Sequence, residues 1–316
     1  MSRAKRMWRL GARPGPDRPA VSGDPDWALA DPRWIKRALA AALARPSGNW
    51  FAVDASQTIG EVPRRYRVGG RELVAWRDRG ELLFAPNACP HMGASLAQGR
   101  VERGCIICPW HGLALGKAGH GGWRPLPAHD DGVLSWVRLA GGPEAPTPAP
   151  ILAERPRHFI AGAIRVEARC EPEDVIANRL DPWHGVHFHP HSFSRLEVVE
   201  QREDAITVRV TYRLARRLGI EVDARFHCPE PRTIAMTIVG GEGAGSIVET
   251  HATPVAPGRT AILEATLATS SRPGFALARR TSRLIRPWIE RAAQRLWVED
   301  AAYAERRYAM RRGELG

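Results

Sequence analysis

Two cysteines and two histidines in the first half of the chain have the types and spacing of metal ligands. Cys89 and His91 form a C-x-H pair, and Cys108 and His111 form a C-x-x-H pair further along. Two loops carrying these pairs, brought face to face, would give two Cys to one iron and two His to the other iron of a [2Fe–2S] cluster. The four residues therefore predict a cluster that carries electrons.

Zinc is the competing interpretation, because two Cys and two His also suit a tetrahedral structural site. Zinc fingers usually pair Cys with Cys and His with His at short spacing, whereas each of these loops mixes the two types. Gly93 and Gly112 follow the histidines, where the backbone must pass close to a cluster. The pattern favours a Rieske centre, in which two His replace two Cys on one iron and raise the reduction potential.

A second group of imidazoles, His184, His187, His189 and His191, lies in a polar segment of the second half. Two imidazoles and one carboxylate on one side of Fe(II) leave positions open for oxygen and substrate. On a regular helix His187 would partner His184 better than His189 does, since residues three apart share a face. A proline directly after His189 is consistent with a helix that ends there. Spacing alone leaves the second imidazole open.

The carboxylate for this site should come from late in the chain, where Glu299 and Asp300 lie in a predicted helix over residues 275–310. Both fall near the apolar face of that helix, where an unpaired carboxylate would be costly and a metal would satisfy it. The apolar face is expected to pack on a sheet. Its predicted members are Ile285, Ile289, Ala292, Leu296 and Tyr303.

Apolar periodicity divides the rest of the chain into recognisable elements. Short alternating runs over Trp50–Leu139 predict a small antiparallel β domain, and further runs between residues 159 and 268 predict a second set of strands. Strands followed by a helix indicate an α+β fold with an antiparallel sheet. The predicted divisions are an N-terminal extension with a short helix (1–47), the small β domain (48–140), a Pro-rich linker (141–156) and a catalytic domain (157–316).

Residues 49–139 resemble the N-terminal domain of Rieske non-haem iron oxygenases, and the second half resembles their catalytic domain. The likeness extends beyond the cluster loops to segments such as Asn49–Val53 and Val68–Arg77. Rieske subunits of respiratory complexes carry an additional Cys in each cluster loop, and nothing equivalent follows Cys89 or Cys108. The resemblance implies an all-β Rieske [2Fe–2S] domain followed by a helix-grip domain, an antiparallel sheet with a C-terminal helix.

The same resemblance assigns roles around a mononuclear iron. The family pattern D-x-x-H-x-x-x-x-H falls on Asp181, His184 and His189, which implies that the two histidines are iron ligands. It implies Asp300 as the third ligand, with Glu299 as the alternative. Asp181 would be an electron-transfer bridge, accepting hydrogen bonds from a histidine of this site and from a Rieske histidine of a neighbouring subunit. Such a carboxylate fixes the tautomer of the ligand histidine.

The implied activity is monooxygenation with O2 and electrons from a ferredoxin, a ferredoxin reductase or both. The Asp-Pro-x-His form of the motif is similar to that of oxygenases acting on chlorophyll-type pigments and sterol-like lipids. We therefore expect hydroxylation or desaturation of a large apolar substrate, isoprenoid or pigment-like, by a homotrimer. The alternative is a non-catalytic Rieske electron-transfer protein with a degenerate C-terminal domain.

The net charge of +12 fits an acidic ferredoxin that docks electrostatically, and no motif suggests nucleic acid. No run of eighteen apolar residues indicates a membrane-spanning helix. The basic, Pro-rich start has no apolar core of a secretory signal, which favours a cytoplasmic protein. The arginines of the C-terminal helix could also rest on an anionic membrane, although packing on the sheet is the expected use of that helix.

Overall fold

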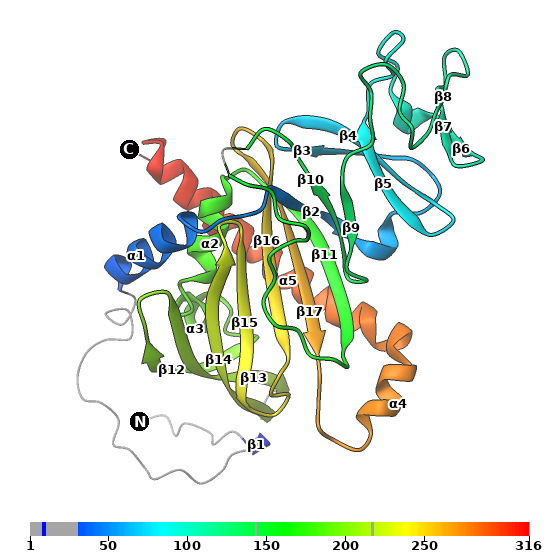
Figure 1. The fold of residues 1–316 in the computed structure, drawn as a ribbon. Helices are drawn as coiled ribbons and strands as arrows, with labels where there is room; N and C mark the ends of the chain where they lie inside the picture. The colour runs from blue at the N-terminus through cyan, green and yellow to red at the C-terminus, as the bar shows by residue number, and fades with distance from the viewer. Residues whose placement is uncertain (1–7, 11–30, 143, 216–217, 316) are drawn as a thin grey trace.

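The computed structural model describes residues 8–10, 31–142, 144–215 and 218–315. Figure 1 shows several small sheets at one end of the molecule and one large sheet, accompanied by helices, at the other. The predicted α+β fold, a domain of strands followed by an antiparallel sheet and a C-terminal helix, is confirmed. Within the predicted N-terminal extension, Trp8–Leu10 form a short strand, β1, parallel to β14 (Leu218–Glu230). Residues 1–7 and 11–30 lie outside the described residues.

Three antiparallel sheets of three strands each make up the N-terminal domain. The sheets are β2 (Trp50–Ala55), β10 (Leu134–Arg138) and β9 (Ala128–Asp130); β3 (Arg64–Val68), β4 (Arg71–Asp78) and β5 (Glu81–Pro86); and β6 (Arg100–Glu102), β7 (Cys105–Ile107) and β8 (Ala114–Leu115). The first two enclose a small apolar core, and runs of buried side chains on β4, β5 and β10 contribute to it. The third sheet carries one of the cluster loops.

The large sheet has the strand order β11-β17-β16-β15-β14-β13-β12, and all of these pairings are antiparallel. Antiparallel neighbours joined by short turns are what the run of apolar segments predicted. Its strands are β11 (Ile160–Ala168), β12 (Phe193–Gln201), β13 (Ala205–Ala215), β14 (Leu218–Glu230), β15 (Thr233–Gly241), β16 (Ile247–Ala256) and β17 (Arg259–Ala268).

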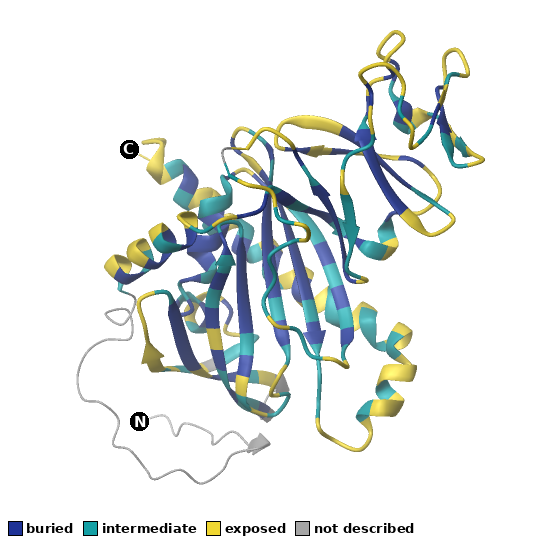
Figure 2. Ribbon diagram, in the orientation of Figure 1, coloured by how far each residue is buried: buried dark blue, intermediate teal, exposed yellow. Residues whose placement is uncertain are grey.

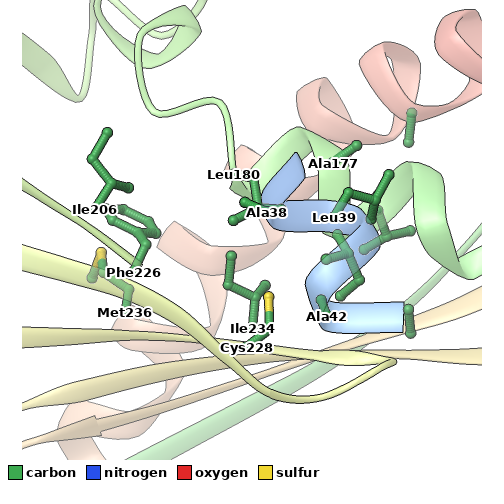
Figure 3. Close-up of a cluster of buried hydrophobic side chains, with 14 of the residues drawn as sticks. Ala38, Leu39, Ala42, Ala177, Leu180, Ile206, Phe226, Cys228, Ile234 and Met236 are labelled. Atoms are coloured by element: carbon green, nitrogen blue, oxygen red, sulfur yellow. The ribbon is translucent and has the colours of Figure 1, made fainter. Parts of the chain in front are cut away.

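Helices cover the large sheet and build its main core. Helix α1 (Pro32–Leu43) and helix α2 (Pro172–Arg179) place alanine and leucine side chains against strands β14 and β15, as Figure 3 shows. Helix α3 (His184–Phe188) follows α2 after a short turn. None of the described helices is long and apolar enough to cross a membrane.

The C-terminal helix differs from the prediction in two ways. It is divided at Thr281 into α4 (Phe275–Arg280) and α5 (Ser282–Arg311), where the Thr281 hydroxyl bonds back to the carbonyl of Leu277 at 3.2 Å. The buried face also lies one residue further along than the predicted one, because the indole of Trp297, rather than Leu296, fills the core. The buried residues are Ala293, Trp297, Asp300, Ala304 and Tyr308.

A buried charged network joins the N-terminal domain to the large sheet. Arg155, in the segment between them, donates to Glu249 on β16 at 2.7 and 2.6 Å and lies 3.1 Å from Asp131 of the N-terminal domain. His251 lies 3.2 Å from Glu249, and the Trp136 indole donates to Asp131 at 2.7 Å. Because these charges are paired across the boundary, the network holds the two parts in one orientation.

Candidate functional site

The two cluster loops share one backbone design. In each loop the glycine N–H donates to the cysteine carbonyl, from Gly93 to Cys89 at 2.8 Å and from Gly112 to Cys108 at 3.0 Å. Both glycines have positive φ, +78° and +74°, a conformation that side chains with a Cβ rarely adopt. The sequence therefore folds each C-x-H or C-x-x-H segment into a tight turn that points its sulfur and its imidazole the same way.

The four side chains separate into an inner pair and an outer pair. The thiols of Cys89 and Cys108 are buried, whereas His91 and His111 are exposed with their Nδ1 atoms 3.2 Å apart. Burial alone would raise the pKa of the Cys108 thiol, but backbone N–H groups at Trp110 and His111 hold that pKa below its usual value. Two inner thiolates and two outer imidazoles fit a [2Fe–2S] cluster with an outward histidine-bound iron.

A second constellation forms where α3 meets α5. Asp300 Oδ1 lies 3.1 Å from Nε2 of His184 and 2.8 Å from Nε2 of His189. The ligand atoms of these three residues all lie within 4.8 Å of one another, and His189 and Asp300 are buried. Two imidazoles and a carboxylate that converge in this way fit a facial iron site with open positions.

The end of α3 decides which histidine joins this group. The helix stops at Phe188, and His189 has a non-helical backbone with φ −119° and ψ 55°. That break turns the His189 ring back toward His184, while His187 stays on the helix and faces solvent. Regular helix geometry, which favoured His187, does not apply across this break.

The second nitrogen of each imidazole also has a partner. Nδ1 of His184 contacts the backbone carbonyl of Asp181, and Nδ1 of His189 lies 2.5 Å from Oε2 of Glu299. The same Glu299 oxygen is 3.7 Å from His191, so these two residues and His189 form a second, shallower group of possible ligands. Partners on Nδ1 fix both tautomers with Nε2 toward Asp300. Glu299 thus contacts the nitrogen of His189 that faces away from Asp300, and so orients the ring.

Electrostatics within the group favour an ionised carboxylate. Burial would raise the pKa of Asp300, but the adjacent imidazoles of His184 and His189 hold it well below its usual range. Burial would lower the pKa of His189, and the carboxylates of Asp300 and Glu299 on its two sides raise it instead. A buried anion held among imidazoles is the charge arrangement that a divalent cation would satisfy.

The carboxylate of Asp181 contacts Tyr303, whereas the resemblance implied a contact with a histidine of the site. Its Oδ2 accepts a hydrogen bond from the Tyr303 hydroxyl at 3.0 Å, and its Oδ1 is buried without a hydrogen-bond partner among the described residues. His184 contacts the Asp181 carbonyl rather than the carboxylate that the resemblance implied. The Tyr303 ring also packs on His184, with ring centroids 5.1 Å apart.

Tyr303 is the site residue whose role sequence reasoning missed. It was assigned only to the apolar face of the helix, but a position three residues after Asp300 lies on the same side of α5. Asn178 is a second such residue: its amide donates to Asp300 Oδ1 at 3.3 Å. Buried Asp174 on α2 links this helix to α5, because its carboxylate accepts hydrogen bonds from Arg311 at 2.9 Å and from Arg307.

Two family profiles match the chain. Residues 49–138 match the Rieske [2Fe-2S] domain, and residues 141–315, more than half of the chain, match a family described as a domain of unknown function, DUF5914. The first match covers both cluster loops, and the second covers the histidine and carboxylate group.

The chain is also similar to solved structures. One is dicamba monooxygenase bound to dicamba, with a TM-score of 0.63 and 17% identity over 85% of this chain and 91% of that chain. Another is a complex of the carbazole 1,9a-dioxygenase oxygenase with ferredoxin, with a TM-score of 0.60 and 15% identity over 91% of this chain and 90% of that chain.

Several relatives in sequence are named as oxygenases. The chain is 31% identical to aminopyrrolnitrin oxygenase of Pseudomonas fluorescens over 34% of its length and 29% of the relative. It is 28% identical to 4beta-methylsterol monooxygenase of Methylococcus capsulatus over 52% of each, and 28% identical to pheophorbide a oxygenase of Oryza sativa subsp. japonica over 37% and 22%. The chain therefore spans about half the length or less of these relatives.

Proposed function

Because this chain belongs to the Rieske non-haem iron oxygenases, with a catalytic half of the DUF5914 family, we propose that it uses O2 and supplied electrons to hydroxylate or desaturate an apolar substrate. The observation that carries the proposal is the convergence of His184, His189 and Asp300 in a chain that also has a two-sided thiol and imidazole pocket. Neither feature alone would suffice. A cluster indicates only electron transfer, and a lone triad lacks an electron source.

In this proposal, the [2Fe–2S] cluster and the mononuclear iron each have residues that would hold them. Cys89 and Cys108 hold the inner iron of the cluster, and His91 and His111 hold the outer one. His184, His189 and Asp300 hold the mononuclear iron. When bound, the cluster supplies single electrons and the mononuclear iron activates O2. The chain itself orients both imidazoles through the Asp181 carbonyl and Glu299, and buries the carboxylate away from water.

Asp181 is the proposed connection to another copy of the chain. Figure 1 places the cluster loops beside β6–β8, at the end of the molecule away from α3, so a chain's own cluster does not face its own triad. The buried, unpartnered Oδ1 of Asp181 supports a donor from outside the described residues, such as a Rieske histidine of a neighbour. This arrangement requires an oligomer, which we propose to be a trimer with neighbouring Rieske domains at each site.

Asp181→Asn is expected to slow electron delivery to the mononuclear site by about 10- to 100-fold, the usual cost of removing such a support. The amide keeps the shape of the side chain and removes its charge. Single-turnover reoxidation of the reduced cluster, followed by absorbance after mixing with O2 and an apolar extract, measures the rate. Reoxidation at the unmutated rate, with unchanged iron content, would show that Asp181 is not the bridge.

The surroundings of the triad support an apolar substrate. Phe188 packs on His189 with centroids 5.0 Å apart, Phe193 lies 6.2 Å from the same ring, and Tyr212 continues this aromatic wall beyond Phe193 at 5.2 Å. Two relatives are named for a methylsterol and for pheophorbide a. We infer an isoprenoid or pigment-like substrate. Mass analysis of an apolar extract incubated with reduced protein and isotopic O2 would identify it by labelled product.

An acidic ferredoxin, with or without its reductase, is the proposed electron donor. The net charge of +12 supports electrostatic docking of an acidic protein, and a structural neighbour is described as a complex with ferredoxin. The exposed rings of His91 and His111 would give such a donor access to the outer iron. In this proposal the protein works in the cytoplasm, with at most peripheral membrane contact.

A further inference from the structure

The side of α4 and α5 that faces away from the sheet carries large apolar side chains and arginines. We propose that this outward face docks the protein onto an anionic lipid surface. The inference deepens the proposed function, because a lipid surface is where an apolar substrate would reside, but docking itself does not depend on catalysis. The outward face consists of Leu277, Leu284, Trp288, Val298, Arg280, Arg283, Arg291 and Arg295.

Four large apolar side chains on this face are open to water. Leu277 is 67% exposed, Leu284 74%, Trp288 71% and Val298 65%. Leu284, Trp288 and Val298 lie on the side of α5 opposite Ala293, Trp297 and Asp300, since helical periodicity places the two sets about half a turn apart, and Leu277 lies on the preceding helix α4. Figure 2 shows α4 and the adjoining turns of α5 as largely exposed. Single exposed leucines are ordinary, but four large exposed apolar side chains on two adjoining helices, with arginines between them, indicate an interaction site.

The charge of the same segment is strongly one-sided. Residues 275–298 contain six arginines and one acid, Glu290. That acid is engaged by Arg286 at 2.6 Å, so it does not neutralise the outward face. The Arg291 guanidinium lies over the Trp288 ring, 5.7 Å from its centroid, which places a charge beside an apolar anchor. Arginines flanking leucine and tryptophan are the composition of helices that lie in a membrane interface.

An anionic membrane fits this face better than a protein partner does. A second copy meeting it symmetrically would bring two arginine-bearing faces together, and a net charge of +12 on each copy adds to that repulsion. An electron donor must reach the cluster loops, and Figure 1 shows β6–β8, which carry one of these loops, well apart from α4. Anionic lipid supplies negative headgroups and an apolar interior together.

Docking through this face would also set the position of the iron triad. Asp300 lies on α5 twelve residues beyond Trp288, which is about 18 Å along the helix axis. The same rigid helix therefore connects the proposed lipid contact with a ligand of the site.

The proposal is tested by flotation of the full-length protein with vesicles of phosphatidylcholine, with and without phosphatidylglycerol. We expect co-flotation only with the anionic vesicles, weakening as salt is raised. Replacing Leu284 and Trp288 with glutamine should lower the partition coefficient by about tenfold or more, since both would lose burial in lipid. Replacing Arg291 and Arg295 with glutamine should weaken binding by about fivefold per arginine.

Matched control variants lie on the N-terminal domain. Val62→Gln removes an apolar side chain that is also 74% exposed, and Arg64→Gln with Arg65→Gln removes two exposed arginines. Both controls should float like the unmodified protein. Equal flotation of controls and test variants, or no anionic preference, would overturn the proposal. So would a self-association, seen by sedimentation without lipid, that the Leu284 and Trp288 changes abolish. Because none of these readouts involves turnover, they are independent of whether the oxygenase activity is established.

Discussion

Asp300→Ala is expected to remove the mononuclear iron and product formation while leaving the cluster spectrum unchanged. The carboxylate is the atom group on which both imidazoles converge, at 3.1 and 2.8 Å. Its loss should weaken iron binding by more than the roughly 10- to 100-fold that loss of a supporting residue costs. Iron analysis should fall from about three to about two atoms per chain, with acid-labile sulfide constant.

Glu299→Gln is the matched control, one residue away on the same helix. Glutamine keeps a hydrogen-bond acceptor near Nδ1 of His189 and removes the charge, so iron binding should weaken without being lost. If Asp300→Ala retained all of its iron and Glu299→Gln lost one atom per chain, Glu299 would be the third ligand. Two irons per chain in the unmodified protein would instead indicate an electron carrier without a mononuclear site.

Arg155→Met is expected to lower the free energy of unfolding by about 3–5 kcal/mol, because it leaves the buried carboxylates of Glu249 and Asp131 without their cation. The change also removes one of the contacts between the N-terminal domain and the large sheet. Thermal and urea unfolding measure this loss of free energy of unfolding. Arg209→Met is the control: it breaks an exposed pair with Asp223 and should cost less than about 1 kcal/mol. Equal losses in the two variants would contradict the role of the buried network.

The same network predicts acid sensitivity. Burial would raise the pKa of Glu249, but hydrogen bonds from Arg155 and His251 outweigh it and lower the pKa to about 2 from an ordinary value of 4.5. A carboxyl with a lowered folded-state pKa stabilises the fold above its unfolded pKa. That contribution is lost as the pH falls from about 4.5 toward about 2. In Arg155→Met this part of the acid dependence should shrink, as measured by urea unfolding across that range.

The spacing of residues in the cluster loops indicated all four candidate ligands, whereas the spacing around the mononuclear site left the second histidine open. Cys89, His91, Cys108 and His111 each lie in a short turn whose glycine fixes the local geometry, so sequence distance translates directly into spatial distance. His184 and His189 are separated by a helix end, and the backbone angles of one residue decide whether His187 or His189 points inward. A pattern of residue types does not specify those angles.

Long-range packing accounts for the other differences. The predicted face of the C-terminal helix followed Leu296, but the buried face follows Trp297, because a fully buried indole has the larger apolar surface to hide. The contact of Tyr303 with Asp181 joins residues that are far apart in sequence. Only the docking of α5 beside α2 and α3 brings them together, and single-sequence periodicity describes each helix in isolation.

The division of the triad between α3 and α5 has a consequence for biosynthesis. A growing chain presents both imidazoles more than a hundred residues before it presents Asp300. Until α5 has been made and Arg311 has paired with Asp174, the nascent domain has the two imidazoles but lacks the Asp300 carboxylate that would help retain a metal. Iron capture should therefore follow translation of that helix, which separates the timing of mononuclear iron loading from that of the cluster, whose loops are complete much earlier.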